Sequence, residues 1–441
     1  MRPGIRQTIT EIISISFIRG SSIYLIGSLI SAAIPMVLLP VLTRYLTPTD
    51  YGIVGTSVVL IQVFTLFLGL NTSGLIGRSH FDDDFQKRQK LVSTNILLAC
   101  ILSLFLILIL VPAGTLVEDM TKFPASWVSV LVFISLGIVI QTIYLSLVQA
   151  RQEPKRYIKI QIFSTLINLS LSLFLVVSLG MNWQGRMLAV LLSGVVIAIV
   201  CLYGLANRLR LLQLAFDKES LNALLSFGVP LIPHFIGGWV MTMVPRLFLN
   251  NMATVADTGL FSVGYNIASP VAMVVGAANQ AYWPVLFGKL SDPGFDRLKM
   301  AQILLFGAAL LPVIAVLYGI SAYGFVPLIV GPRFYDAAGY VFWLALAFAV
   351  QGIYFIFGNF VVYSKRTSLI SWRADFLGGI SILILCPLLI HVSGPIGAAQ
   401  ATMIAFTIST IGCITASRKA LPMPWKKAVY SLVNNRILSM K

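Results

Sequence analysis

Charged and amide side chains inside long apolar stretches are the residues of this sequence that could do chemistry. A charge at the centre of a bilayer costs about 2.5–3.5 kcal/mol, so such a group usually faces a cavity or a polar partner. We therefore expect these side chains to line a polar cavity and to bind a substrate there. The candidates for substrate binding are Arg246, Arg44, His234, Asn279, Gln62 and Arg373.

Several of these residues have a second interpretation. Asp375 is one of few acids in any apolar stretch and is our candidate for ion coupling, but it could instead form a structural ion pair with Arg373 or Lys159. His234 could be a hydrogen-bonded core residue or a proton-responsive group. For Arg44, and equally for Arg186, snorkelling to the membrane interface would also explain the position.

Signs of catalysis or of a cofactor site are absent from the sequence. The three histidines, His80, His234 and His391, are isolated from one another, and no Gly-rich nucleotide-binding loop follows a strand. The four cysteines are scattered without metal-ligand spacing, which is typical of small core residues. We therefore expect no cofactor, no metal and no enzymatic activity.

The composition excludes a water-soluble fold. Of the 441 residues, 58% are hydrophobic and only 10% are charged, whereas soluble domains have about 25% charged residues. The net charge of +16 does not indicate nucleic-acid binding, because the basic residues lie between apolar stretches and form no continuous stripe. Membrane lipids, through their head groups, are the expected partners.

Apolar length and punctuation predict an all-α integral membrane protein of about twelve transmembrane helices, since a helix needs about 20 residues to cross a bilayer core. Proline and small residues in the first and seventh spans predict that both helices bend. The predicted spans are 20–46, 51–77, 91–117, 124–150, 155–180, 184–206, 220–249, 257–288, 300–329, 336–363, 367–392 and 396–416.

The distribution of basic residues predicts that both termini are cytoplasmic. With this orientation, only five of the 31 Lys and Arg residues fall on the outer side, as the positive-inside rule requires. These five are Arg44, Lys122, Arg186, Arg246 and Arg333.

The two halves of the sequence are weak copies of each other. Arg44 precedes Asp50-Tyr51-Gly52 between spans one and two, and Arg246 precedes Asp257-Thr258-Gly259 between spans seven and eight. We therefore predict two pseudo-symmetric six-helix lobes, 1–210 and 211–441, around a central cavity, with an axis along the membrane normal. Aligning the Asp residues places Gln62, Gly69, Thr72 and Ser73 over Ser269, Gly276, Asn279 and Gln280.

The segment Pro40–Gly52 resembles the Wzx-type polysaccharide flippases of the multidrug/oligosaccharidyl-lipid/polysaccharide (MOP) exporter superfamily. The resemblance implies a V-shaped pair of lobes and, as substrate, an oligosaccharide unit on undecaprenyl pyrophosphate. It also implies alternating access in the bacterial inner membrane and, as possible partners, other membrane proteins of polysaccharide assembly. Arginine would suit such a substrate, because its guanidinium binds phosphate oxygens through two parallel hydrogen bonds.

Two alternatives stay open at this point. A multidrug or cation antiporter of the same superfamily would favour acids in the cavity, but the charges within the spans are mainly arginines. A polymerase or ligase of the same polysaccharide pathway would be expected to carry a long outer loop with catalytic residues. The longest outer stretch, near 116–125, is short.

Overall fold

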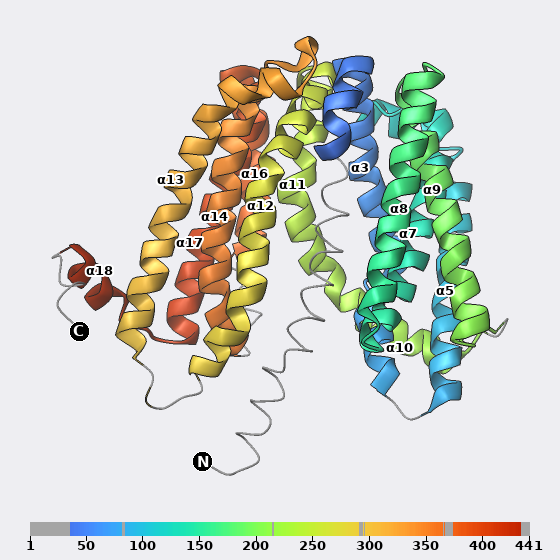
Figure 1. Cartoon of the computed structure of the whole chain (residues 1–441), viewed down its shortest axis with the longest axis horizontal. Helices are drawn as coiled ribbons and strands as arrows, with labels where there is room; N and C mark the ends of the chain where they lie inside the picture. Colours follow the sequence, from blue (N-terminus) through green and yellow to red (C-terminus); the bar gives the residue numbers. More distant parts are fainter. Residues whose placement is uncertain are drawn as a thin grey trace. The chain divides into compact units, whose positions relative to one another are not determined.

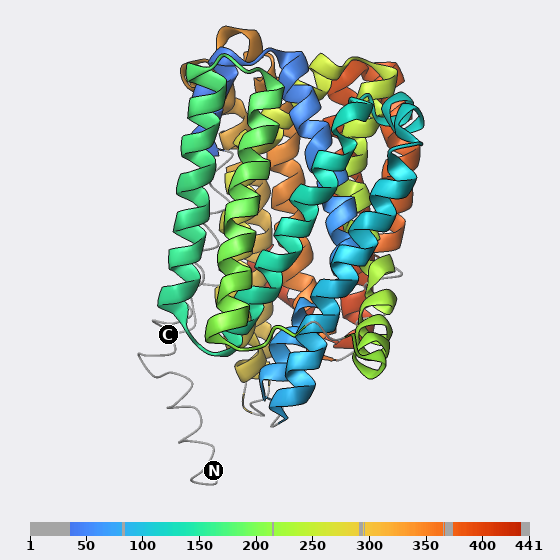
Figure 2. The same ribbon diagram turned by 90° about the vertical axis from the view of Figure 1, so that its right-hand side faces the viewer.

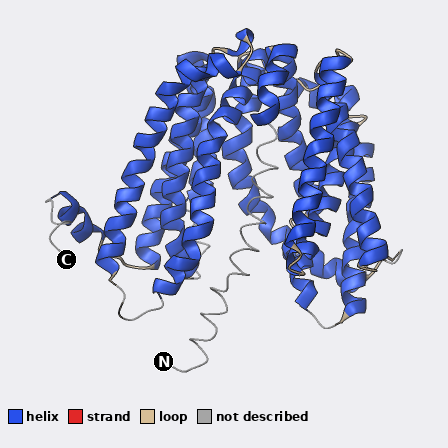
Figure 3. Ribbon diagram, viewed as in Figure 1, coloured by secondary structure: helices blue, strands red, loops and turns tan. Residues whose placement is uncertain are grey.

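The chain folds into helices. The computed structural model describes residues 36–81, 84–213, 216–290, 296–364 and 374–433, together with Gly294 and Arg366. Throughout these residues the regular elements are helical and no strand occurs (Figure 3). A helix satisfies its own backbone hydrogen bonds, which is what a segment surrounded by lipid requires. The predicted all-α class is confirmed.

The helices follow the predicted spans in order. Among the described residues, nine segments are long and apolar enough to cross a membrane, or ten if one bent pair of helices is a single span. The segment 376–420 contains two helices, α16 and α17. The spanning helices are α3 (Pro48–Gly69), α5 (Phe85–Leu110), α7 (Val128–Ala150), α8 (Pro154–Ser172), α9 (Trp183–Tyr203), α12 (Val255–Leu290), α13 (Arg297–Ile329), α14 (Ala337–Tyr363), α16 (Phe376–Ser393) and α17 (Gly397–Ala420).

The second and seventh predicted spans are each broken, and the first is described only at its end, so its predicted bend lies outside the described residues. Only the end of the first predicted span lies in the described residues, as the helix Met36–Tyr45. The second predicted span, 51–77, is two helices, because Leu70 and Asn71 have positive φ angles of 46° and 51° and so end α3 before α4 (Ser73–Arg78).

The seventh span is the bent pair, α10 (Lys218–Gly228) and α11 (Ile232–Met252). The angle between the segments Lys218–Leu231 and Phe235–Met252 is 55°. The short 3-10 turn that separates the helices, Val229–Leu231, contains Pro230, which has no N–H to continue the helical hydrogen bonds. The predicted bend in this span is confirmed.

The described chain divides into two compact units. The first contains residues 36–38 and 53–233, and the second contains 39–52 and 234–433. The connection 211–233, which follows the predicted boundary, groups with the first unit. Six-helix lobes that meet at residue 210 stay a prediction.

The first unit is organised around α7. This helix packs against α4, α5, α8 and α9 (Figure 2, blue to green helices). The contact with α9 is close because both helices have a glycine there: a Cβ on Gly137 would lie 3.3 Å from the carbonyl oxygen of Gly194. Small residues let membrane helices approach in this way.

The second unit is organised around α14. This helix packs against α12, α13 and α17, and α16 packs against α17 (Figure 1). Gly264 of α12 meets Tyr340 of α14, and Gly352 of α14 meets Val275 of α12. The fourth of the six predicted spans in each half of the sequence is therefore the central helix of its unit.

Candidate functional site

The two joints that the sequence pairs have the same hydrogen bonds. Before α3, the backbone N–H and Oγ1 of Thr47 donate to Asp50 Oδ2 at 2.9 and 2.6 Å, and the Asp50 N–H donates to Thr47 Oγ1 at 3.1 Å. Before α12, Thr254 and Asp257 form the same three bonds at 3.1, 2.6 and 3.1 Å. This reciprocal pattern caps a helix N-terminus.

The two joints also contact each other, within the second unit. A Cβ on Gly52 would lie 1.9 Å from the carbonyl oxygen of Val255, and a Cβ on Gly259 would lie 2.0 Å from that of Pro48. The first turns of α3 and α12 therefore touch backbone to backbone at the two glycines of the Asp-x-Gly pairs. The sequence pairs these glycines but does not show that they meet.

Arg246 lies on α11, close to this contact. Its side chain is only 4% exposed. Nε donates to Ser262 Oγ at 3.3 Å, and Nη1 donates to the carbonyl oxygen of Thr242 at 2.8 Å. The guanidinium carbon is 4.5 Å from the ring centroid of Tyr265 and 5.3 Å from that of Phe261. Two aromatic faces of α12 thus stabilise the cation.

The charge of Arg246 is not neutralised within the described chain. No carboxylate of the described residues forms an ion pair with the guanidinium. Nor does Nη2 donate a hydrogen bond to any residue that the structure describes. The surrounding rings are packed on others, Tyr265 on Phe348 at 5.2 Å and Phe261 on Tyr340 at 6.0 Å. We call Phe261 and Tyr265 the aromatic cradle; contact between Arg246 and a substrate stays a prediction.

Two other predicted residues have partners inside the second unit. Asn279 of α12 accepts a hydrogen bond at Oδ1 from Asn359 Nδ2 of α14, at 2.8 Å. Asp375, 7% exposed, accepts at Oδ1 from the Tyr354 hydroxyl at 2.9 Å, and Gly237 of α11 packs on its Cβ. Its pairing with Arg373 lies outside the described residues, and pairing with Lys159 stays a prediction.

The remaining predicted site residues are not brought into this group. Arg44 is exposed, and its Nη1 donates to the carbonyl oxygen of Pro40 on its own helix. Gln62 is exposed on α3. The side chain of His234 and all of Arg373 lie outside the described residues. Roles for these four residues in binding stay predictions.

The first unit contains a polar line on α8 that the sequence analysis missed. Gln161, Thr165, Asn168 and Ser172 recur at spacings of four, three and four, which places them on one face of the helix. Gln141 of α7 donates from Nε2 to Gln161 Oε1 at 3.3 Å. The spacing was visible in the sequence and was the signal that could have found this line.

Arg186 of α9 completes this polar line. Its Nη1 donates to Asn168 Oδ1 at 2.7 Å and to Ser172 Oγ at 2.6 Å, and Asn168 Nδ2 donates to Ser193 Oγ at 3.0 Å. The guanidinium of Arg186 therefore has hydrogen-bond partners on α8, and snorkelling to the membrane interface is not needed to explain its position.

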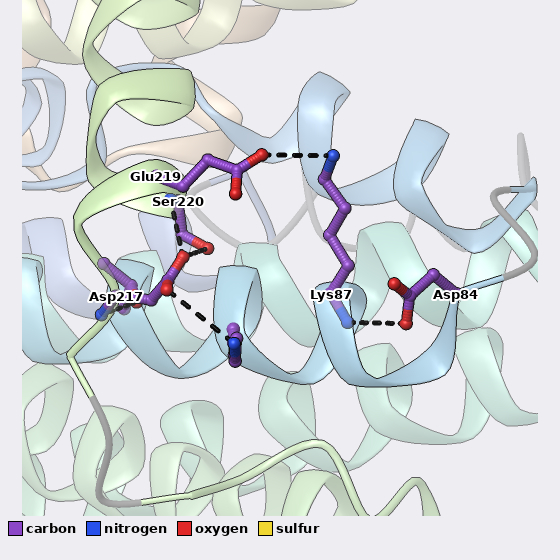
Figure 4. Close-up of polar contacts among 7 residues, drawn as sticks. Asp84, Lys87, Asp217, Glu219 and Ser220 are labelled. Atoms are coloured by element: carbon purple, nitrogen blue, oxygen red, sulfur yellow. Dashed lines mark hydrogen bonds and ion pairs between the residues drawn. The ribbon is translucent and has the colours of Figure 1, made fainter.

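Ion pairs in the first unit connect α5 to α10 (Figure 4). Lys87 Nζ lies 3.4 Å from Glu219 Oε1, and Lys90 Nζ lies 3.9 Å from Asp217 Oδ1. Asp217 also caps α10, because its Oδ2 accepts from the N–H and Oγ of Ser220 at 2.8 and 2.7 Å. These hydrogen bonds from Ser220 lower the pKa of the Asp217 carboxyl.

A cavity of about 460 Å³ adjoins these ion pairs, and both signs of charge line it. The basic lining residues are Arg78, Lys87, Arg88 and Lys90, and the acids are Asp84, Asp217 and Glu219. Since the three acids offset most of the charge of the four basic residues, we assign this group to holding α10 and not to binding an anion.

Comparison with solved structures identifies the fold. The lipid II flippase MurJ, in an inward closed conformation, has a TM-score of 0.71 at 13% identity, over 96% of this chain and 93% of that chain. An inward-facing multidrug resistance MATE family transporter of the MOP superfamily has a TM-score of 0.67 at 15% identity, over 93% and 96%. At these identities the likeness concerns the fold alone.

Sequence comparison identifies the family. An uncharacterized membrane protein of Haemophilus influenzae is 24% identical over 366 residues, which are 81% of this chain and 86% of that protein. A family model described as polysaccharide biosynthesis protein matches residues 17–288, more than half of the chain. The chain therefore belongs to the polysaccharide biosynthesis protein family, as a multi-pass membrane protein with the fold of MOP-superfamily transporters.

Proposed function

We propose that this chain is a flippase that moves an oligosaccharide unit on undecaprenyl pyrophosphate across the bacterial inner membrane by alternating access. Membership of the polysaccharide biosynthesis protein family supports a role in that process, and the lipid II flippase MurJ has a similar fold. Such a substrate has a charged diphosphate and a sugar head, which need a polar path while the lipid tail stays in the membrane.

The observation that carries the proposal is the environment of Arg246. Its positive charge is held inside a helical unit by aromatic faces and neutral oxygens, with no carboxylate among the described residues to cancel it. In a site of low dielectric, such a charge attracts an anion more strongly than in water. We propose that the Nη2 edge offers the donors for the diphosphate when the transporter opens around it.

The described acids support an anionic cargo over a cationic drug. Asp50 and Asp257 accept hydrogen bonds as helix caps, and Asp375 accepts one from Tyr354. These carboxylates therefore already have structural partners, whereas Arg246 keeps its charge. No observation favours a polymerase or ligase, and we propose a transporter without enzymatic activity.

We propose that both termini are cytoplasmic and that membrane lipids and other membrane proteins of polysaccharide assembly are the partners. Labelling of single cysteines tests the orientation, after replacement of Cys100, Cys201, Cys386 and Cys413. Both Gln86 and Asp119 are exposed. A cysteine at Asp119 should react with an impermeant reagent from outside, whereas one at Gln86 should react only after the membrane is opened.

The substrate is tested in a strain that lacks this chain. Sugar heads on the outer leaflet are oxidised with membrane-impermeant periodate in spheroplasts, and the lipid-linked intermediates are quantified by mass spectrometry. We expect lipid-linked intermediates to accumulate without oxidation of their sugar heads in the deletion strain, and oxidation to return when the chain is restored. Normal oxidation of the sugar heads without the chain contradicts the proposal. Proton-driven export of ethidium by the purified chain in vesicles, without any effect on the intermediates, would instead favour the antiporter.

A further inference from the structure

The C-terminal helix α18 (Trp425–Val433) is fastened to the second unit. The indole of Trp425 packs on Phe357 at 5.0 Å and on Phe360 at 5.6 Å, both from α14. Gln302 of α13 donates from Nε2 to Ser431 Oγ at 2.7 Å. Figure 1 shows α18 beside the end at which α13 begins. The helix therefore lies at the end of the second unit at which α13 begins.

A groove of about 760 Å³ runs between α18 and the ends of the spanning helices. Its apolar wall includes Leu305 of α13, Phe357 of α14, Met423 just before α18, and Trp425, the first residue of α18. The charged residues of its lining are all basic: Arg418, Lys426 and Lys427. In contrast to the cavity of mixed charge beside α10, no acid among the described residues lines this groove.

The outer surface of α18 is amphipathic. Tyr430 is 69% exposed and Val429 is 49% exposed, next to the exposed Lys426 and Lys427. A short helix that presents an aromatic ring, an aliphatic side chain and lysines at the end of membrane spans is typical of the bilayer interface. At the bilayer interface, lysines are suited to bind lipid phosphates and apolar side chains to contact acyl chains.

We propose that this groove binds one anionic glycerophospholipid, with its phosphate among Arg418, Lys426 and Lys427 and an acyl chain along Leu305 and Phe357. Charge complementarity favours an anionic head group, because Arg418, Lys426 and Lys427 line one groove and no described acid lies among its lining residues. The apolar wall favours a lipid over a free phosphate, since a soluble anion would leave that wall unused. This site is separate from Arg246 and does not depend on the proposed cargo.

Native mass spectrometry of the purified, delipidated full chain tests the site. The probes are dioleoyl phosphatidylglycerol and dioleoyl phosphatidylcholine, which differ in head-group charge but share their acyl chains. We expect phosphatidylglycerol to bind roughly tenfold or more tightly, given the contribution of clustered basic residues near a lipid phosphate. The variant Arg418→Gln/Lys426→Gln/Lys427→Gln should bind both lipids alike.

A matched variant separates the groove from general surface charge. Lys289, Arg297 and Lys299 are exposed basic residues near the same ends of α12 and α13, but they do not line the groove. Their triple change to Gln removes the same charge and should leave the preference for phosphatidylglycerol intact. Equal loss in both triple variants, or equal binding of the two lipids by the unmodified chain, overturns the proposal.

Two further arms test the apolar wall. Leu305→Trp fills the groove without changing charge and should weaken binding of phosphatidylglycerol several-fold, while the thermal unfolding midpoint in detergent reports whether the variant is folded. Glycerol 3-phosphate should not displace the lipid. Displacement by glycerol 3-phosphate at comparable concentration would show an anion site that does not use the groove, and would refute lipid binding there.

Discussion

The two joints are alike in their backbone and different in their arginines. Each of the joints Thr47–Gly52 and Thr254–Gly259 has the same three capping hydrogen bonds between its Thr and its Asp. The two joints contact each other at their glycines. Arg44, before the first joint, is exposed and bonds to its own helix. Arg246, before the second joint, is buried against Phe261 and Tyr265.

This difference separates what a duplicated motif does for the fold from what one copy does for function. The caps and the glycine contact hold two helix starts together, and both copies are needed because each glycine faces the other joint's backbone. Of the two paired arginines, only Arg246 is buried. We infer that the two joints together stabilise the starts of α3 and α12, and that of the two arginines only Arg246 provides a charge for an anionic cargo.

The largest expected effect comes from closing the glycine contact. Gly52→Ala and Gly259→Ala each place a methyl group at 1.9–2.0 Å from a carbonyl oxygen, so the helix starts must separate. Overpacking of this kind costs about 1–3 kcal/mol or more. We expect both variants to lose folded protein to a similar degree, measured as membrane abundance and as the unfolding midpoint in detergent.

Gly276→Ala is the matched control for the glycine contact. Gly276 is also on α12, but a Cβ there meets nothing within 4 Å. It should keep normal abundance, because alanine also favours helix over glycine. If Gly52→Ala were tolerated while Gly259→Ala was not, the joints would not be reciprocal.

The next effect distinguishes the two arginines in transport. Arg246→Ala should abolish flipping at normal abundance, whereas Arg44→Ala should retain most of it, because only Arg246 holds a buried charge. Arg246→Lys should keep part of the activity, since lysine retains the charge but loses the planar fork. Periodate oxidation of outer-leaflet sugar heads and membrane abundance are measured on the same cells. Full transport by Arg246→Ala would refute a role of Arg246 in transport. Loss of abundance in both Arg246→Ala and Arg246→Lys would assign Arg246 to the fold.

The order of helices and the existence of the joints could be predicted from the sequence, because apolar length and a repeated motif are local signals. The break after α3 was not predicted, although Gly69-Leu70-Asn71-Thr72-Ser73-Gly74 is a run of mostly small and polar residues, because the prediction rested on apolar length and this run lies between two apolar stretches. Apolar length alone does not reveal a backbone turn.

The site could be predicted only as a set of residue types. The charge of Arg246 within a span was visible, but its aromatic cradle comes from another helix, so a contact across helices had to be known. Arg186 shows the same limit. The sequence leaves open whether it lies at the interface or faces a polar partner, because its partners Asn168 and Ser172 are on the polar face of the preceding helix.

A smaller effect tests how the cradle stabilises Arg246. Tyr265→Leu removes the nearer aromatic face, and a desolvated cation–π contact contributes about 2 kcal/mol. We expect a lower unfolding midpoint for Tyr265→Leu, whereas Tyr265→Phe keeps the ring and should stay near the unmodified chain. In the background Arg246→Leu, the two substitutions at Tyr265 should no longer differ in this way. A persistent difference there would mean that the ring acts by packing and not through the cation.

The smallest effect belongs to the caps, where the comparison predicts equality. Thr47→Val and Thr254→Val each keep the side-chain shape but remove the hydroxyl that donates to Asp50 or Asp257 at 2.6 Å and accepts its N–H at 3.1 Å. Loss of a helix cap costs about 1 kcal/mol, so each variant should lower the unfolding midpoint slightly and by a similar amount. Because the joints meet at their glycines, a loosened first turn on one side should also loosen the other. The double variant should therefore deviate from additivity. Strict additivity in a double-mutant cycle would mean that the glycine contact holds the helix starts regardless of their caps.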